Sequence, residues 1–386
     1  MTKTLRYGYT TGACATAAAR GAVLMLRDQQ LLDEADIILP TGESVRFRLH
    51  GQELCSDSAR CYVVKDAGDD PDVTNGAEIH AEVTLAKASG DETVIITGGT
   101  GIGRVTKPGL AIRQGEWAIN PVPCKMIAQV INEVFSIHCP LLTSQNSPLV
   151  PHVTISIPNG EELARKTLNA RLGIIGGLSI LGTTGIVKPI SSLAWTETIN
   201  AAVDVAVACG CKTLVLATGR TSELAVQKHF AAAAGVPAHP CRTEGEKLPG
   251  KNRRELSDEA FIMMGDHVGH ALRTCERKGI RNVVLAAQFA KLLKIACGHE
   301  QTHVSSSRLD LNQLQEWLAG SPRAARFVPC VAQANTAREV LEATGAAKEL
   351  ISLVGSRASH FAAQLAPCLR VKVLLAGYAG EVLYFR

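Results

Sequence analysis

The stretch Lys212–Glu223 reads KTLVLATGRTSE and changes character halfway along. Its first half is a largely apolar run, which predicts a strand buried on both faces. Its second half is a polar turn that leads into a helix. Asn282–Ala287 (NVVLAA) repeats the apolar run, and a helix is predicted over Phe289–Ala296 directly after it. Buried strands that alternate with helices are typical of a doubly wound, Rossmann-like α/β domain with a mostly parallel sheet.

The segments on either side extend this C-terminal domain. Leu193–Cys209 predicts a helix that connects it to the preceding residues, and another helix is expected from about Asp258 to Arg277. Near the end of the chain, Val371–Leu375 and Glu381–Tyr384 predict a hairpin. The pattern leaves open which sheet this hairpin joins.

The N-terminal half alternates between apolar and polar residues instead. Ala35–Leu39 and Val45–Leu49 predict the two strands of a hairpin, and Glu78–Leu85 predicts a strand with one wet face. A helix is expected from Pro123 to about Val134, because proline favours the first turn of a helix. Such alternation predicts a two-layer α+β domain, whose largely antiparallel sheet is covered by helices on one side.

Length and composition bound the class of protein. A chain of 386 residues exceeds what one hydrophobic core usually holds, so we expect an α+β domain over 1–195 and an α/β domain over 196–386. Hydrophobic residues make up 46% of the chain and aromatic residues 4%, which indicates a globular protein packed with small aliphatic side chains. The formal net charge of +4 argues against a nucleic-acid binder.

Neither membrane nor export signals are recognisable. The first residues lack the apolar core of a signal peptide, and the most apolar long stretch, Leu193–Cys209, contains Glu197 and Asp204. We therefore expect a cytoplasmic protein with no membrane partner. The 12 cysteines are scattered singly, as reduced thiols usually are, and the Cys209–Cys211 pair has no second pair to complete a metal site.

Two turns rich in small residues and hydroxyls stand out. Tyr9–Ala19 (YTTGACATAAA) runs from such a turn into an alanine-rich helix, whose first amides can bind an anion. Gly176–Gly185 (GGLSILGTTG) has a similar composition. Together they predict a site built largely from backbone for an anionic organic ligand, with these candidate residues: Thr10, Thr11, Gly12, Thr183 and Thr184.

Nucleotide-type binding has two candidate turns. Thr97, Gly99, Gly101 and Gly103 follow a short predicted strand, as in the glycine loops of methyltransferases and dinucleotide enzymes. The alternative is a tight turn lining a cleft, because Lys107–Gly109 (KPG) blocks a helix after the loop. The second candidate is Thr218 with Gly219, at the carboxyl end of a predicted parallel strand.

Charged residues gather near these turns. Lys65–Gly76 contains four carboxylates. They are either ordinary turn residues or part of a site in which repulsion between carboxylates raises the pKa of one of them. In the second case Asp69 and Asp70 are the candidate bases. Arg104, Lys107 and Arg113 lie in or beside a glycine-rich segment and can bind carboxylates.

His299–His303 (HEQTH) matches the HExxH motif of zinc peptidases. A zinc hydrolase that uses His299, Glu300 and His303 is therefore a rival hypothesis. Gly298 directly precedes the motif and serines follow it, so the helix that zinc binding requires is not expected here. The alternative is a chain segment whose Thr302 and His303 face a cleft.

In this order, the motifs resemble those of the CbiD family, the cobalt-precorrin-5B C1-methyltransferases of anaerobic cobalamin synthesis. The matching segments are Tyr9–Ala15, Lys65–Gly76, Gly101–Leu110, Ala118–Pro123, Leu178–Val187 and Gly298–His303. The sequence departs from the family pattern at three positions. Cys124 replaces a basic residue, His267 replaces an aromatic residue, and Gln288–Lys291 lacks a glycine before its lysine.

The resemblance implies transfer of a methyl group from S-adenosylmethionine to C1 of cobalt-precorrin-5B, giving cobalt-precorrin-6A. Cobalt then arrives within the substrate, and the protein needs no metal site. The small-residue turns, the three basic residues and Asn120 would hold the corrinoid, and Asp69, Asp70 or His303 would act as base. A non-catalytic tetrapyrrole carrier is a further alternative, and a homodimer is compatible with the sequence.

Overall fold

The computed structural model describes residues 5–87, 93–135, 149–189, 191–233 and 256–386. It is a mixed α/β protein of two compact units, 1–191 and 192–386. The boundary predicted between residues 195 and 196 falls inside the first helix of the second unit. Among the described residues, no helix combines the length and apolar character needed to cross a bilayer.

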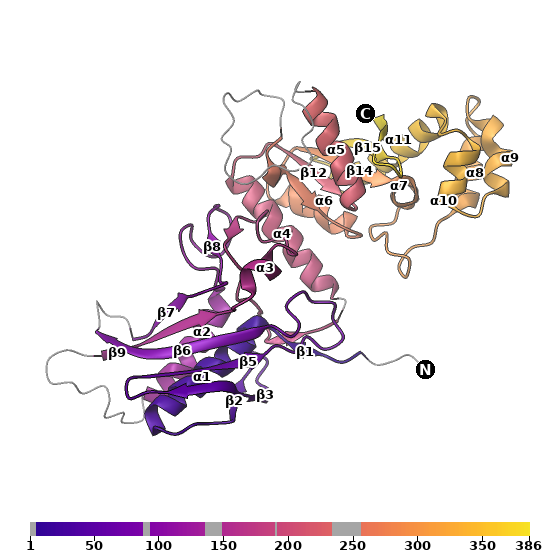
Figure 1. The fold of residues 1–386 in the computed structure, drawn as a ribbon. Helices are drawn as coiled ribbons and strands as arrows, with labels where there is room; N and C mark the ends of the chain where they lie inside the picture. The colour runs from indigo at the N-terminus through magenta and orange to yellow at the C-terminus, as the bar shows by residue number, and fades with distance from the viewer. Residues whose placement is uncertain (1–4, 88–92, 136–148, 190, 234–255) are drawn as a thin grey trace. The chain divides into compact units, whose positions relative to one another are not determined.

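The first unit contains short and long strands with helices between them (Figure 1). Its strands are β1 Gly8–Tyr9, β2 Glu34–Ile38, β3 Ser44–Arg48, β4 His50–Leu54, β5 Ser58–Val64, β6 Glu78–Lys87, β7 Ile95–Gly98, β8 Arg104–Val105, β9 Leu149–Ser156, β10 Ile174–Ile175 and β11 Ile186–Val187. Its helices are α1 Thr11–Asp28, α2 Pro121–Phe135 and α3 Gly160–Ala164.

The main sheet of this unit has the order β4-β5-β6-β9-β7. Its pairs are antiparallel except for β7 with β9, and β2 and β3 form the predicted antiparallel hairpin. Helix α1 packs on β5 and β6, and α2 packs on α1. Ala13 to Ala19 are buried on all sides, so their small side chains let the helix approach the sheet closely.

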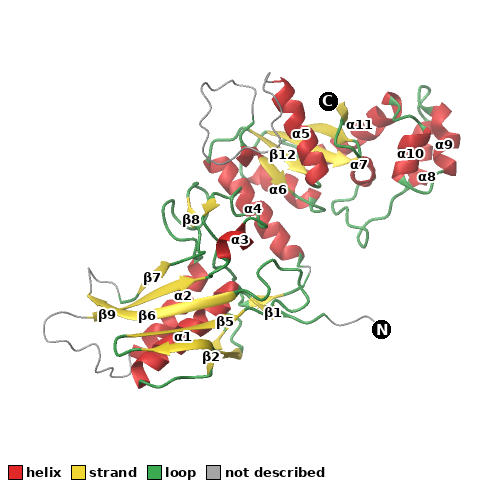
Figure 2. Cartoon of the chain, viewed as in Figure 1, coloured by secondary structure: helices red, strands yellow, loops and turns green. Residues whose placement is uncertain are grey.

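The second unit contains a sheet with helices on its faces (Figure 2). Its strands are β12 Thr213–Ala217, β13 Phe261–Met263, β14 Asn282–Gln288, β15 Arg370–Ala376 and β16 Val382–Phe385. Its α-helices are α4 Ser192–Ala208, α5 Arg220–Ala233, α6 Val268–Arg277, α7 Phe289–Ala296, α8 Leu311–Ala319, α9 Val328–Gln333, α10 Ala337–Ala343 and α11 Lys348–Leu365.

This sheet has the order β13-β12-β14-β15-β16, parallel except for β16. The terminal hairpin therefore belongs to the second unit. After β12 the chain passes through α5 to β13, the neighbour of β12 at one edge of the sheet. After β14 the chain continues in the opposite direction to β15. Right-handed crossovers then place α5 on one face and α6 and α11 on the opposite face. The carboxyl ends of β12 and β14 form the edge at which open α/β sheets bind ligands.

The helix predicted over Asp258–Arg277 is wrong in its first half. Phe261–Met263 forms β13, which pairs in parallel with β12, and the helix begins only at Val268. Gly265, between them, has a φ of +57°, which ends the strand in a turn. The buried Phe261 and Ile262 gain more from pairing at the sheet edge than from a helix that would be half exposed.

Candidate active site

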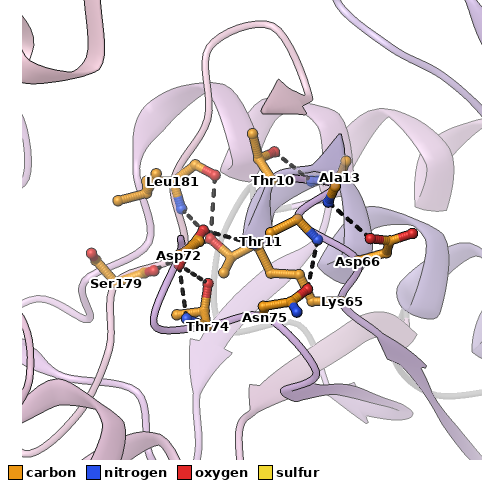
Figure 3. A network of polar contacts seen from close by, with 12 residues as sticks. Thr10, Thr11, Ala13, Lys65, Asp66, Asp72, Thr74, Asn75, Ser179 and Leu181 are labelled. Carbon is orange, nitrogen blue, oxygen red and sulfur yellow. Dashed lines mark hydrogen bonds and ion pairs between the residues drawn. The ribbon is translucent and has the colours of Figure 1, made fainter. Parts of the chain in front are cut away.

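The start of α1 is closed by the chain's own loop (Figure 3). The side chain of Thr10 accepts a hydrogen bond from the Ala13 N–H at 3.2 Å, as an N-cap residue does. The Gly12 N–H donates to the Leu181 carbonyl at 2.9 Å, and the Thr11 hydroxyl accepts from the Leu181 N–H at 3.0 Å. These contacts join two of the small-residue turns and occupy the amides of Gly12 and Ala13 with protein acceptors.

Thr183 and Thr184 lie on the loop that closes α1, and Asn120 contacts this loop from the segment before α2. The Asn120 N–H donates to the Ile180 carbonyl at 2.9 Å, directly before α2 begins. The Thr184 hydroxyl accepts from the Ile186 N–H at 3.3 Å, and Thr183 is exposed. The structure therefore brings these three predicted residues to the loop that closes α1.

The acidic loop packs beside β1. Lys65 is 2% exposed, and its ammonium contacts the Asp72 carboxylate at 2.6 Å. Burial by itself raises the pKa of Asp72, but Lys65 and two hydrogen bonds from Thr74 outweigh burial and lower the pKa. Arg6 lowers the pKa of Asp66 by a hydrogen bond. These two carboxyls therefore do not show the raised pKa expected from clustering.

The two candidate bases of this loop are placed differently. One oxygen of Asp69 accepts the Arg6 N–H at 2.8 Å, and the side chain is exposed. Asp70 is half-buried, and its N–H donates to the Ala67 carbonyl at 3.4 Å. Both stand at the tip of a turn that Gly68 permits with a φ of +68°.

The space beside the glycines at 98–103 is filled by other backbone and side-chain atoms of the first unit. A Cβ on Gly101 would lie 1.9 Å from the Ile157 carbonyl oxygen, and one on Gly103 would lie 2.9 Å from that of Gly177. A Cβ on Gly99 would meet the Ser156 hydroxyl at 2.3 Å. These glycines are thus required for close packing between loops, which is the tight-turn alternative.

The three basic residues share one loop module. Val105, Ile112, Ala118 and Ile174 form its small core. The Arg104 guanidinium stacks on the Trp117 ring at 3.6 Å and donates to the Gly115 carbonyl at 2.8 Å. Lys107 donates to the Arg171 carbonyl at 3.3 Å, and Arg113 is exposed. The module holds three cations along one loop of the first unit.

In the second unit, Thr218 and Gly219 follow β12 at the carboxyl edge of the sheet. The Thr218 N–H donates to the Ala286 carbonyl of β14 at 3.0 Å, and the Gly219 N–H donates to the Ser222 hydroxyl at 3.2 Å. A Cβ on Gly219 would meet no atom within 4 Å. This glycine, unlike those at 98–103, borders open space.

A polar cluster that the sequence analysis missed follows β13 at the same edge. The Asp266 carboxylate binds the Lys291 ammonium and accepts from the Thr302 hydroxyl at 2.6 Å. The helix predicted over Asp258–Arg277 includes Asp266, whereas the structure places this residue just after a strand end. The usable signal was the apolar run Phe261–Met264 followed by Gly265, since this pattern is typical of a strand that ends in a turn.

His303 adjoins this cluster and is among the groups that lower the pKa of Asp266. Its Nδ1 contacts the Ser305 hydroxyl at 2.8 Å and accepts the Ser305 N–H at 3.3 Å. This ring nitrogen is therefore occupied by the neighbouring turn.

The zinc motif does not lie on a helix. Helix α7 ends at Ala296, and residues 299–303 form turns and irregular chain. Both oxygens of Glu300 bind Arg273, one of them at 2.7 Å. No cluster of three potential metal ligands occurs among the described residues. The geometry of the zinc hydrolase hypothesis is therefore not met.

Two departures from the family pattern have local partners. The Gln301 amide contacts Nδ1 of His267 at 3.3 Å, and Trp195 stacks on the His267 ring. Burial lowers the pKa of His267. The Cys124 thiol contacts the Ile119 carbonyl at 3.5 Å, and burial raises its pKa. Both side chains are accommodated without an unpaired charge.

Comparison with known proteins covers both units. The CbiD family model matches residues 1–189, and the model of the CbiD C-terminal domain matches residues 301–385. A cobalt-precorrin-5B C(1)-methyltransferase from Geobacter sulfurreducens is 60% identical over 99% of this chain and 98% of the relative. The same-named protein of Priestia megaterium is 43% identical over 88% of this chain and 83% of the relative.

A crystal structure of the cobalamin biosynthesis protein CbiD from Archaeoglobus fulgidus is 27% identical. It covers 77% of this chain and 81% of its own, with a TM-score of 0.37. The full-length identity to the curated relatives, together with the matching family model, shows that the chain belongs to the CbiD family.

Proposed function

We infer that the protein is a methyltransferase that acts on C1 of cobalt-precorrin-5B in cobalamin biosynthesis. The observation that carries this inference is 60% identity to a relative of that name over 98% of the relative's length. The matched length includes both units. We therefore assign the relative's complete activity to this chain, and not the role of one domain alone. A cytoplasmic location and a homodimer stay predictions.

S-Adenosylmethionine is the proposed methyl donor. In the transfer, the bond between the methyl carbon and the sulfonium sulfur breaks, and its electron pair stays on sulfur. A carbon of the conjugated corrinoid ring donates the electron pair of the new carbon–carbon bond, and the macrocycle gives up one proton to the base. Because the displacement is in line, alignment of the two carbons and exclusion of water supply most of the acceleration. Cobalt takes part only as a component of the substrate.

We place the donor at Thr218 and Gly219. The support is twofold: these residues lie at the edge where the chain leaves β12 and β14 in opposite directions, and Gly219 borders open space. This arrangement is that of a Rossmann-like, doubly wound domain. In the alternative loop over Thr97–Gly103, other atoms of the protein fill the space beside each glycine, so this loop is not part of the proposal.

The carboxylate arms of the corrinoid are proposed to bind Arg104, Lys107 and Arg113. The three residues lie within ten positions of one another in the chain, and stacking on Trp117 orients the Arg104 guanidinium. Thr183 is an exposed hydroxyl beside the loop that closes α1 and is a further candidate contact.

Asp69 is the proposed base among the three candidates. Among the described residues, one of its carboxylate oxygens accepts the Arg6 N–H and the other has no bonded partner. An acceptor of this kind can take a proton, whereas Nδ1 of His303 is occupied by Ser305. Asp69→Asn should lower the rate of methyl transfer without changing the affinity for S-adenosylhomocysteine. An unchanged rate would assign the base elsewhere.

The activity is tested by anaerobic incubation of the full chain with S-adenosylmethionine and cobalt-precorrin-5B. Mass spectrometry should detect one added methyl group on the corrinoid and formation of S-adenosylhomocysteine. Corrinoid binding with no consumption of the donor would contradict the inference and favour a carrier. Methylation at a position other than C1, read by NMR of the product, would contradict the assigned regiochemistry.

The donor site is tested separately with Gly219→Val. The new side chain enters open space next to the strand end, so the fold is retained and the affinity for S-adenosylmethionine should fall at least ~10-fold by calorimetry. Gly320→Val, at the exposed end of α8, is the matched control and should bind normally. Equal affinity in the Gly219 variant and the wild type would remove the donor from this turn.

A further inference from the structure

Asp266 lies one strand away from the proposed donor turn. Strand β13 pairs in parallel with β12, and the pairing continues past the strand end, because the Met264 N–H donates to the Ala217 carbonyl at 2.9 Å. Gly265 then turns the chain, and Asp266 follows. The carboxylate and the Thr218–Gly219 turn are therefore presented at the same edge of the sheet by neighbouring strands.

The carboxylate is held in one orientation. Its Oδ1 binds both the Lys291 ammonium and the Thr302 hydroxyl, and the Asp266 carbonyl accepts the Thr302 N–H at 3.0 Å. Among the described residues, Oδ2 has no bonded partner, and the side chain is 22% exposed. One oxygen of a fixed carboxylate is thus available to a ligand.

The charge of the group decides what it can bind. Burial raises the pKa of Asp266, but hydrogen bonds from Lys291 and Thr302 outweigh burial and lower the pKa, so the group is ionised at neutral pH. Its charge is already balanced by Lys291, which makes a second cation a poor ligand. An ionised carboxylate with spare lone pairs is instead a strong acceptor for hydroxyl donors.

We propose that Oδ2 of Asp266 accepts hydrogen bonds from the ribose hydroxyls of the methyl donor. The inference rests on the proposed donor site, since a nucleoside at Thr218 and Gly219 would place its sugar toward the next strand of the sheet. An acidic residue that binds a ribose in this way is common in α/β nucleotide-binding domains. Thr302 and Lys291 act as positioning residues that hold the carboxylate.

Glu300 is the matched control for this carboxylate. It lies two positions before Thr302, and Arg273 occupies both of its oxygens. Glu300→Gln therefore removes a carboxylate from the same region without removing a free acceptor. Asp266→Asn has the same shape as the wild-type residue and removes the charge that a hydroxyl would recognise.

The experiment is calorimetry on the full chain with S-adenosylhomocysteine and with its 2′,3′-dideoxy analogue. The wild type should bind the dideoxy compound ~10- to 100-fold more weakly, which is the value of hydrogen bonds to a charged group. Asp266→Asn should lose a similar factor for S-adenosylhomocysteine and should discriminate between the two ligands by less than ~3-fold. Glu300→Gln should behave as the wild type.

The outcomes separate the inference from the proposed function. A wild type that binds neither compound overturns the donor assignment itself. A wild type that binds both, together with an Asp266→Asn variant that discriminates as strongly as the wild type, overturns only the role of Asp266. Thr302→Val supplies a second measurement if Asp266→Asn melts early. This variant keeps the charge of Asp266 but removes the hydrogen bond that orients its carboxylate. It should therefore lower the affinity for S-adenosylhomocysteine and leave the affinity for the dideoxy analogue unchanged.

Discussion

Gly101→Ala separates a structural role of the 98–103 loop from a ligand-binding role. Gly101 has a φ of +73°, and its missing Cβ would lie 1.9 Å from the Ile157 carbonyl oxygen and 3.0 Å from the backbone of Gly160. The Gly101 carbonyl also accepts the Leu178 N–H at 2.9 Å, so the loop cannot shift without losing this bond. Alanine therefore adds backbone strain and overpacking at the same point.

The two costs give the magnitude. A left-handed conformation costs a non-glycine residue about 1–2 kcal/mol, and overpacking against backbone costs about 1–3 kcal/mol, so the free energy of unfolding should fall by about 2–5 kcal/mol. A unit of this size loses roughly 2–4 °C in melting temperature per kcal/mol, which predicts a decrease of roughly 4–20 °C.

The assay is differential scanning calorimetry, with Gly219→Ala as control. A Cβ on Gly219 would meet no atom within 4 Å, so this variant should keep its free energy of unfolding within about 0.5 kcal/mol of the wild type. A Gly101→Ala protein with wild-type stability that has lost S-adenosylmethionine binding would refute the reasoning, because the loop would then contact the ligand.

Further predictions concern buried groups. Lys65→Met should lower the free energy of unfolding by about 3 kcal/mol in urea titrations, the low end for a broken buried ion pair, because Asp72 stays 26% exposed; a neutral result would mean that the pair is not desolvated. The pKa of Asp72 is lowered, so its stabilising contribution is present above its unfolded pKa of about 3.9 and disappears as the pH falls through the lower folded value. The free energy of unfolding of Lys65→Met should therefore fall less than that of the wild type as the pH is lowered through this range. Burial raises the pKa of Cys14 to about 12, so a thiol reagent at neutral pH should label the exposed Cys368 and leave Cys14 unmodified until the protein unfolds.

Elements with a strong local pattern agree with their sequence predictions. The apolar run predicted from Lys212 forms a strand over Thr213–Ala217, and the helix Phe289–Ala296 has the predicted bounds, since their apolar residues are buried and leave few alternatives. The alternation of Ser44–Arg48 likewise predicts the hairpin with β2. The segment Asp258–Arg277 fails because a strand of three residues has no period of its own, and only the presence of β12 beside it favours a strand.

For the candidate site, too, local patterns and long-range contacts determine different features. Sequence patterns are sufficient to predict candidate segments, because glycine turns, hydroxyl caps and charged loops depend on interactions between residues close in the chain. Long-range contacts decide which groups of these segments are buried or paired and which are open. Backbone atoms of Ile157 and Gly177 fill the space beside Gly101 and Gly103, whereas Gly219 borders open space. Asp266 gains its oriented carboxylate from Lys291 and Thr302, 25 and 36 positions away, which no local pattern encodes.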